Sequence, residues 1–399
     1  MAIGLSSAAA LAAMSPYALA QSPAGSIQLG SGYVYPEVEF AVQHDNNIAL
    51  QPDARRTADT IKYVRPSFRL DARSEAHYYD TGYKGEYARY NSVTTDDHDN
   101  HEVFAGGDWT LNARNNVRLR GQYLDKVDPR GTLDISTPSP SEYHQEILTG
   151  LYTYGAQGAA GRLELQAGAY SKNYVNNPSA TAALDHSKTD IGSTLLLRIQ
   201  PKTYATLTAR QYRYQYAEAG SAKDSNEMFI SAGLRWNVTA LTSGNFSVGN
   251  QTKKFDSAAG AAGSNDFSGI AWEGGLNWKP LFYSSFDFVT QRRPAEATGI
   301  GAFVVNQTSQ ITWTHVWGSR VTTVLTAAHS KDSYVDAPVP AAGGQDRQDV
   351  SRTGSVRTLY AVQRWLKFGV EYAGSMRDSN DDKFDYRRNQ FMLLVGITL

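Results

Sequence analysis

Charged and tyrosine side chains recur at alternate positions along many short segments of this chain. Glu37 and Glu39 are separated by one apolar residue, as are Arg118 and Arg120. Guanidinium groups offer forked donors that match carboxylates or phosphates, and tyrosine rings offer hydroxylated surfaces along which a sugar could slide. We interpret such residues as the lining of a path for a polar substrate, and the candidates are Glu37, Glu39, Arg65, Arg69, Arg118, Arg120, Arg162, Tyr170, Arg198, Arg210, Tyr212, Lys253, Glu273, Asp287, Arg357, Lys367 and Glu371.

A simpler interpretation is available for each of these residues. Opposite charges on neighbouring strands pair with one another and keep a wall soluble without contacting any substrate. For a single residue this pairing is the preferred explanation, whereas the set as a whole favours a lined path.

No motif indicates a catalytic centre or a cofactor. The chain has no cysteine, which excludes thiolate metal sites and a cysteine nucleophile. The stretch DDHDNH, residues 96–101, could bind a divalent cation through His98 and His101, although a solvated loop is the simpler interpretation. The other histidines and the many serines are scattered, so a chance Ser–His pair means little. We therefore expect no enzymatic activity and no cofactor.

The elements that must position the polar residues are β-strands. In the segment from Gln390 to Leu399, apolar residues share one parity and mostly polar residues share the other, which is the period of a strand with one apolar face. Similar segments recur along the chain, joined alternately by long polar loops and short turns. This rhythm predicts an all-β, transmembrane, up-and-down antiparallel β-barrel of about eighteen strands, with about sixteen as the alternative.

A closed barrel requires the last strand to pair with the first, which is predicted at Val34 to Gln43. Without a plug, a barrel of this size has a water-filled interior. No segment is long and apolar enough to form a plug domain, although the loops that begin near Asp125 and Tyr334 could fold inward.

Aromatic residues support the membrane assignment. Six of the tryptophans lie near predicted short turns, namely Trp109, Trp236, Trp278, Trp313, Trp317 and Trp365. The tyrosines near long loops are Tyr87, Tyr90, Tyr174, Tyr216 and Tyr334. We predict that the two groups form aromatic girdles at the two membrane interfaces. Pro66 falls inside a predicted strand, where we expect a bulge or a position without a ladder hydrogen bond.

The N-terminal residues are typical of a secretory signal. A short apolar run precedes Ala18-Leu19-Ala20, a small-x-small cleavage pattern, and predicts a mature start at Gln21. A buried N-terminal helix is the alternative. We thus expect a signal peptide at residues 1–20, a flexible periplasmic segment at 21–32 and the barrel at 33–399. The net charge of −1 gives no reason to expect nucleic acid.

Several stretches are similar to a known family. They are HDNNI at residues 44–48, DTIKYVRPSFRL at 59–70, DPRGTLD at 128–134, KKFDS at 253–257, WEGGLNWKP at 272–280, QTSQITWTHVWGSR at 307–320 and the closing strand. With these the chain resembles the putative β-barrel porin 2 family and, within it, the EpsL-type outer-membrane proteins encoded with exopolysaccharide or exosortase gene clusters. The resemblance makes Pro66 a family feature and supplies no catalytic residues.

What the resemblance implies is export of a polysaccharide across the bacterial outer membrane. The expected partners are the polysaccharide chain, periplasmic export or chain-length machinery, outer-membrane lipid and lipopolysaccharide, and the barrel assembly machinery. A general diffusion porin for small solutes is the first alternative. A barrel enzyme acting on lipid or polymer is the second.

Overall fold

The protein forms a single closed β-barrel. The computed structural model describes residues 26–239, 241–256, 266–299, 301–335 and 346–398. Its barrel strands are β2 (Gly32–Asp45), β3 (Asp59–Arg73), β4 (His77–Tyr90), β5 (His98–Asn112), β6 (Asn115–Asp128), β7 (Ser141–Tyr154), β8 (Gly161–Tyr174), β9 (His186–Gln200), β10 (Thr203–Tyr216), β11 (Ser225–Thr239), β12 (Thr242–Phe255), β13 (Phe267–Leu281), β14 (Ser284–Glu296), β15 (Phe303–Trp317), β16 (Val321–Val335), β17 (Gln348–Gln363), β18 (Leu366–Ser379) and β19 (Tyr386–Thr398).

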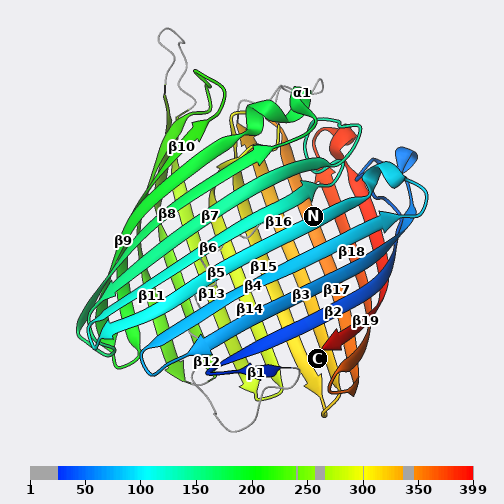
Figure 1. The fold of residues 1–399 in the computed structure, drawn as a ribbon. Helices are drawn as coiled ribbons and strands as arrows, with labels where there is room; N and C mark the ends of the chain where they lie inside the picture. The colour runs from blue at the N-terminus through cyan, green and yellow to red at the C-terminus, as the bar shows by residue number, and fades with distance from the viewer. Residues whose placement is uncertain (1–25, 240, 257–265, 300, 336–345, 399) are drawn as a thin grey trace.

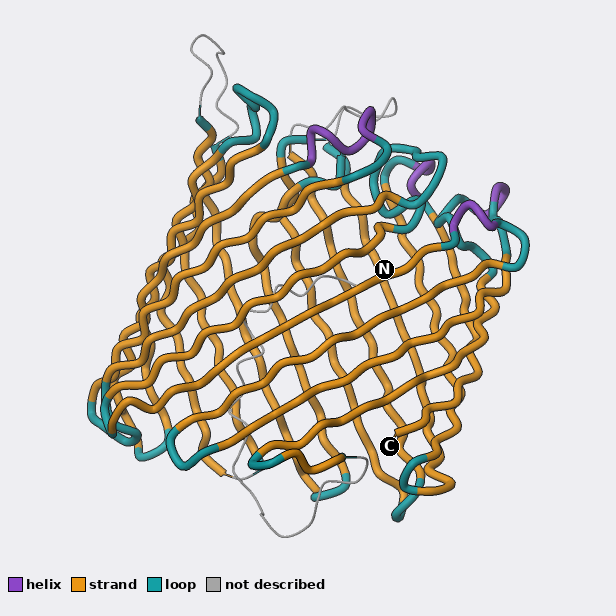
Figure 2. Tube along the Cα trace, viewed as in Figure 1, coloured by secondary structure: helices purple, strands orange, loops and turns teal. Residues whose placement is uncertain are grey.

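Each strand pairs antiparallel with its neighbours in sequence, and the tilted strands wrap into a barrel (Figure 2). Short helical turns occur in the long loops at one end, namely η1 (Asp53–Arg55), η2 (Thr94–Asp96), α1 (Pro178–Thr181), η3 (Ala182–Leu184) and η4 (Asp382–Phe384). We assign this end to the cell exterior and the short turns to the periplasm, as in outer-membrane barrels. The predicted eighteen-stranded barrel is confirmed.

The barrel closes between the last strand and the first, as predicted. β19 pairs antiparallel with β2 from Gln390 opposite Asp45 to Thr398 opposite Glu37. Figure 1 shows the C-terminal strand lying beside the N-terminal blue strands. Because a lipid-exposed sheet edge would leave backbone groups without partners, this pairing is required for the fold in a membrane.

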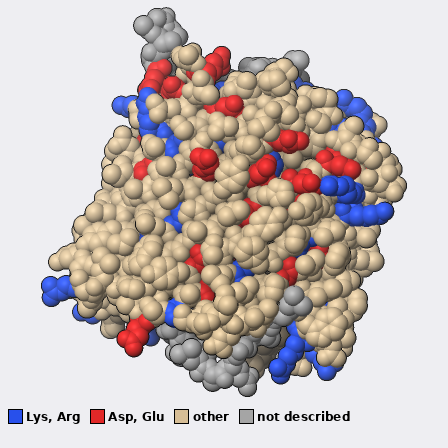
Figure 3. All heavy atoms as spheres, viewed as in Figure 1, with Lys and Arg blue, Asp and Glu red and all other residues tan. Residues whose placement is uncertain are grey.

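The two faces of the sheet differ sharply in polarity. Large apolar side chains such as Phe40, Leu207 and Leu393 are exposed on the outer face. In Figure 3 the side wall is mostly neither acidic nor basic. The polar residues have the opposite parity and face the lumen. A small apolar cluster also faces inward, where Ile48 of the β2–β3 loop packs with Ile61 and neighbouring residues.

The periplasmic tryptophan girdle is confirmed, whereas the tyrosine girdle is largely wrong. The six tryptophans lie at or near the periplasmic ends of their strands, and Trp278, Trp317 and Trp365 are exposed. Of the tyrosines near the long loops, only Tyr87 shares the parity of the lipid face, because it pairs with the exposed Val64. The other four have luminal parity, so loop proximity alone did not determine their direction.

Pro66 interrupts the ladder without a bulge. The β3–β4 pairing stops at Val64 opposite Tyr87 and resumes at Ser67 opposite Lys84 with the same register. The second of the two expected solutions, a position without a ladder hydrogen bond, is therefore the one adopted. An apolar hollow of about 580 Å³, lined by Pro36, Pro66 and Phe68 among others, lies beside this interruption.

The described part of the expected flexible segment contains a strand. β1 (Ile27–Leu29) folds back on the start of β2, with Ile27 opposite Val34. The sequence predicted no strand before residue 33, because the surrounding glycines and serines obscure so short a pattern. The predicted signal peptide lies outside the described residues. No helix among the described residues is long and apolar enough to cross a membrane.

Removal of Gln390 to Leu399 should abolish assembly, because it removes every pairing of β19 with β2. We expect the truncated protein to lack the folded, heat-modifiable band on semi-native gel electrophoresis. Leu399→Phe, which keeps the strand, serves as the control and should fold normally. A truncated protein that still migrates as a folded barrel would contradict the closure argument.

Candidate functional site

The candidate site is the luminal wall of the barrel and the loops that cover its extracellular mouth. The strand registers place all seventeen predicted path residues on the inward-facing parity. They are distributed around the whole circumference instead of converging on one point. This arrangement is typical of a lined passage and differs from a compact active site.

An ionic network crosses the closure seam inside the lumen. Arg65 donates to Glu39 at 2.7 Å and to Glu86 at 2.8 Å. Arg357 donates to the other oxygen of Glu39 at 2.5 Å and lies 3.7 Å from Glu371. The network thus joins β4, β3 and β2 to β17 and β18 across β19.

Several other predicted residues are also held in ion pairs. Arg118 lies 2.7 Å from Asp108, Arg120 lies 2.7 Å from Asp80, and Arg210 lies 3.1 Å from Glu273. Arg69 lies 3.9 Å from Asp71 and 4.7 Å from the ring centroid of Tyr35. For these residues the charge-pairing interpretation describes the structure well. Asp287 instead accepts a hydrogen bond from Asn277.

Four predicted residues lack such partners. Within the part of the chain that the structure describes, Arg162, Arg198, Lys367 and Glu37 make no ion pair. Arg162, Arg198 and Lys367 lie near the short periplasmic turns, whereas Glu37 lies closer to the middle of β2. Their charges remain available to a solute entering from the periplasm.

Tyrosines and lysines dominate the extracellular half of the wall on β7 to β12. The Lys172 ammonium lies 3.8 Å from the ring centroid of Tyr143, and Tyr170 stacks on His186 with ring centroids 5.4 Å apart. Lys253 is fully buried, with Nζ 2.9 Å from both Glu227 and Glu296. This part of the wall combines aromatic rings with hydrogen-bonding groups.

The loop between β6 and β7, residues 129–140, forms part of a cap on the extracellular mouth. Arg130 pairs with Asp96 of the β4–β5 loop at 2.9 Å, and Leu133 is buried. Gly131 has a φ of +80°, and a Cβ there would approach the Ala49 carbonyl oxygen to 2.1 Å, so only glycine fits. The expected inward folding of the loop after Asp125 is therefore observed. Most of the loop after Tyr334 lies outside the described residues.

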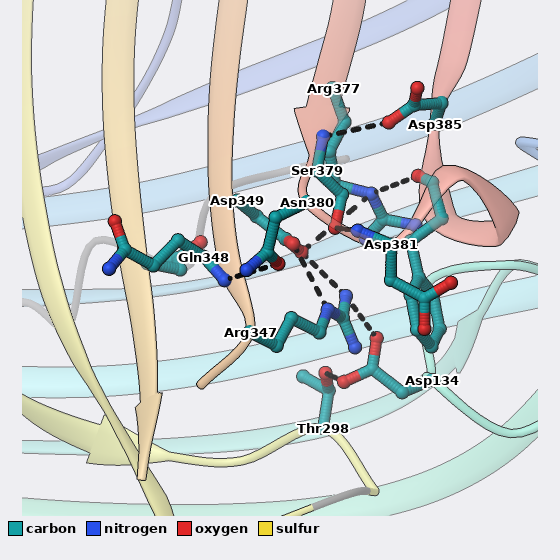
Figure 4. Close-up of polar contacts among 12 residues, drawn as sticks. Asp134, Thr298, Arg347, Gln348, Asp349, Arg377, Ser379, Asn380, Asp381 and Asp385 are labelled. Carbon is teal, nitrogen blue, oxygen red and sulfur yellow. Dashed lines mark hydrogen bonds and ion pairs between the residues drawn. The ribbon is translucent and has the colours of Figure 1, made fainter. Parts of the chain in front are cut away.

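Asp134 ties the cap to the far side of the barrel. Its backbone N–H donates to the Thr298 carbonyl at 2.9 Å, and its carboxylate accepts from the Thr298 hydroxyl at 3.0 Å. Asp134 Oδ1 also lies 3.0 Å from Arg347 Nη2, an ion pair without hydrogen-bond alignment. Thr298 follows β14 and Arg347 precedes β17, whereas Asp134 follows β6, so these contacts span the mouth (Figure 4).

Arg347 is itself held from several sides. Its guanidinium donates to both oxygens of Asp349, at 3.0 and 2.5 Å, and lies 3.4 Å from the ring centroid of Phe384. Although burial disfavours its charge, the hydrogen bond to Asp349 and the charges of nearby groups raise the pKa of Arg347 above its ordinary value. Arg347 therefore remains a cation buried within the cap.

The two histidines considered for a metal site do not converge. Both belong to β5, not to a solvated loop, and residues three apart on a strand face opposite sides. His98 Nδ1 contacts the Asp96 carbonyl at 2.8 Å, whereas His101 Nδ1 contacts the Tyr83 hydroxyl at 2.8 Å. No group of three or more potential metal ligands occurs among the described residues.

Sequence reasoning missed several of these residues. Arg235 lies on the luminal face, where it pairs with Glu164, and strand parity could have identified it as it did its neighbours. Asp134, Thr298 and Arg347 lie in aperiodic loops, so no spacing indicated that they meet. Their association depends on the closed barrel.

This architecture defines the class of the protein: an outer-membrane β-barrel with a polar lumen. The chain belongs to the family described as Putative beta-barrel porin 2, whose model matches residues 21–399. No curated protein sequence matches the chain significantly.

Several solved barrel structures are similar to this chain only at low sequence identity and low TM-score. OpdK of Pseudomonas aeruginosa is 10% identical with a TM-score of 0.46, the match covering 91% of this chain and 98% of OpdK. OprD of the same organism is 13% identical with a TM-score of 0.43, covering 92% and 95%. A bacterial polysaccharide outer membrane secretin is 8% identical with a TM-score of 0.36, covering 91% and 98%. These values are too low to indicate a shared function.

Replacing Asp134 with alanine should release the cap. Because Arg347 keeps Asp349 as a partner, loss of the Asp134 carboxylate should cost about 1–3 kcal/mol, so local opening should increase by about tenfold or more. We expect faster hydrogen–deuterium exchange of backbone amides in residues 129–140, with the strands unchanged.

The matched control is Asp53→Asn, which removes an exposed ion pair with Arg56 at 3.8 Å in the β2–β3 loop. Exposed pairs contribute little, so exchange in residues 129–140 should not change. Unaltered exchange in the Asp134→Ala protein would show that the contacts of Asp134 with Thr298 and Arg347 do not hold the loop.

Proposed function

We propose that this barrel is a gated conduit that exports a secreted exopolysaccharide across the outer membrane. The observation that carries the proposal is the set of contacts that Asp134 makes with Thr298 and Arg347, which we call the clamp. It joins three loops from opposite sides of the extracellular mouth. A general diffusion porin works with a permanently open eyelet, whereas a dedicated exporter benefits from a cap that opens when its substrate arrives. The resemblance to EpsL-type proteins supports the choice of polymer.

The luminal wall supports a sugar polymer as the cargo. Most of its charges are neutralised in pairs, so the wall as a whole neither strongly attracts nor repels a weakly charged chain. Between these pairs lie tyrosines, including Tyr170 and Tyr212, and hydroxyl pairs such as Thr194 and Thr208 at 3.0 Å. Individually weak contacts of this kind allow a polymer to slide without being trapped.

Partners follow from the same proposal. Polymer reaching the periplasmic entrance requires export or chain-length machinery on that side. The apolar outer wall requires outer-membrane lipid with lipopolysaccharide, and insertion of such a wall requires the barrel assembly machinery. We propose the mature chain to begin at Gln21 after signal-peptide cleavage.

Deleting the gene should abolish secretion of the polymer and cause it to accumulate in the periplasm. The measurement is the amount of extracellular and periplasmic polysaccharide, compared with cells complemented by the intact gene. Normal secretion without periplasmic accumulation would reject the export function.

Conductance of the purified barrel in planar bilayers separates the gated conduit from the diffusion porin. The wild-type protein should remain mostly closed, and Asp134→Ala should open it, because the clamp is lost. Asp53→Asn should behave like the wild type. A stable, large conductance of the wild-type protein would instead favour the general diffusion porin.

A further inference from the structure

A cluster of arginines occupies the periplasmic entrance on β8 to β11. Arg162 on β8 lies opposite Leu196 on β9, and Arg198 is two residues further along β9 on the same luminal face. Arg198 pairs with Tyr204 on β10, and Tyr204 pairs with Arg235 on β11. The strand register thus places Arg198 and Arg235 on either side of Tyr204 and Arg162 diagonally next to Arg198, all on the luminal face. Diagonal and directly opposite neighbours of this kind lie close enough for one ligand to contact several of them.

The cluster has an excess of positive charge, because no ion pair among the described residues involves Arg162 or Arg198. Its one carboxylate, Glu164, accepts two hydrogen bonds from Arg235, at 2.7 and 3.0 Å. Arg198 is exposed, and the buried Nε of Arg162 has no hydrogen-bond partner. Arginines elsewhere on the wall, such as Arg120, instead have a carboxylate partner. The unpaired guanidinium groups of Arg162 and Arg198 are therefore free to bind an anionic ligand.

The two ends of the barrel also differ in charge, and the periplasmic end is the more basic one. Turns at the periplasmic end carry Arg114, Lys202, Arg320 and Arg364. Among the charged residues of the described extracellular loops most are acidic, including Asp96, Asp97, Asp185, Asp381, Asp382 and Asp385. Figure 3 shows basic side chains protruding at the lower, periplasmic edge. An anionic chain is therefore attracted to the entrance from the periplasm.

We propose that Arg162, Arg198 and Arg235, together with Tyr204, form an entrance site for an anionic sugar unit of an acidic polysaccharide. The guanidinium forks bind the carboxylate of the sugar, and the tyrosine ring packs against its apolar face. This inference rests on the proposed export function and specifies its substrate class. A neutral polymer would leave Arg162 and Arg198 without a counterion, since only Arg235 is paired with Glu164 among the described residues.

Binding of defined oligosaccharides to the full-length, detergent-solubilised barrel tests the site. Isothermal titration calorimetry with tetragalacturonate, a tetramer of uronic acids, should detect binding that weakens as salt is added. The uncharged maltotetraose should bind at least about tenfold more weakly. Equal affinity for the two probes would overturn the proposal.

Variants localise the binding. Arg162→Gln/Arg198→Gln should weaken tetragalacturonate binding by at least about tenfold, since charge-assisted hydrogen bonds are lost. Arg55→Gln/Arg56→Gln makes the same charge change in the exposed β2–β3 loop and should bind like the wild type. Arg198→Gln alone changes an exposed side chain and provides a variant that folds. Wild-type affinity in both entrance variants would overturn the proposal.

The secretion assay distinguishes failure of this site from failure of the export function. If gene deletion stops secretion but the entrance variants bind tetragalacturonate normally, only the arginine site is rejected. If gene deletion leaves secretion unchanged, the export function itself is rejected, whatever the binding result.

Discussion

The whole structure depends on one constraint, the need to pair every backbone group that faces lipid. A barrel satisfies this constraint only if β19 closes on β2, and the observed register does so over the full length from Asp45 to Glu37. Once the ring is closed, the register of each strand fixes which residues face lipid and which face the lumen. The position of each luminal charge is therefore a consequence of backbone pairing, and the ionic network around Arg65 and Glu39 forms across the seam that this pairing creates.

The periodic part of the molecule was predictable from the sequence, and the aperiodic part was not. Strand parity correctly indicated the closed barrel and the luminal direction of the path residues, because one apolar face must meet lipid. Tyrosines such as Tyr216 and Tyr334 were instead assigned by proximity to loops, and that prediction was wrong because both have luminal parity and are buried. Strand parity gave no sign of the contact between Asp134 and Arg347, because two residues more than two hundred positions apart meet only after the barrel closes.

The stretches that resemble the family gain a physical meaning from their positions. HDNNI contributes Asp45, which pairs with Arg388, and Ile48, which packs into the lumen. DPRGTLD contributes the cap residues from Arg130 to Asp134. KKFDS contributes Lys253, whose ion pair with Glu296 anchors the end of β14 just before Thr298. Three stretches without catalytic character thus supply contacts in the extracellular half of the barrel, at the closure seam, in the cap and at the end of β14.

The interruption at Pro66 has a mechanical consequence for the wall. A barrel resists expansion through hydrogen bonds that run around its circumference, and between β3 and β4 those bonds are missing at Arg65 and Pro66. The Arg65–Glu86 ion pair joins the same two strands on the luminal side. This ion pair therefore resists widening of the barrel at a position where backbone hydrogen bonds between the two strands are absent. Under the proposed export function, a polymer that competes for the Arg65 guanidinium would remove this link and loosen the wall between β3 and β4.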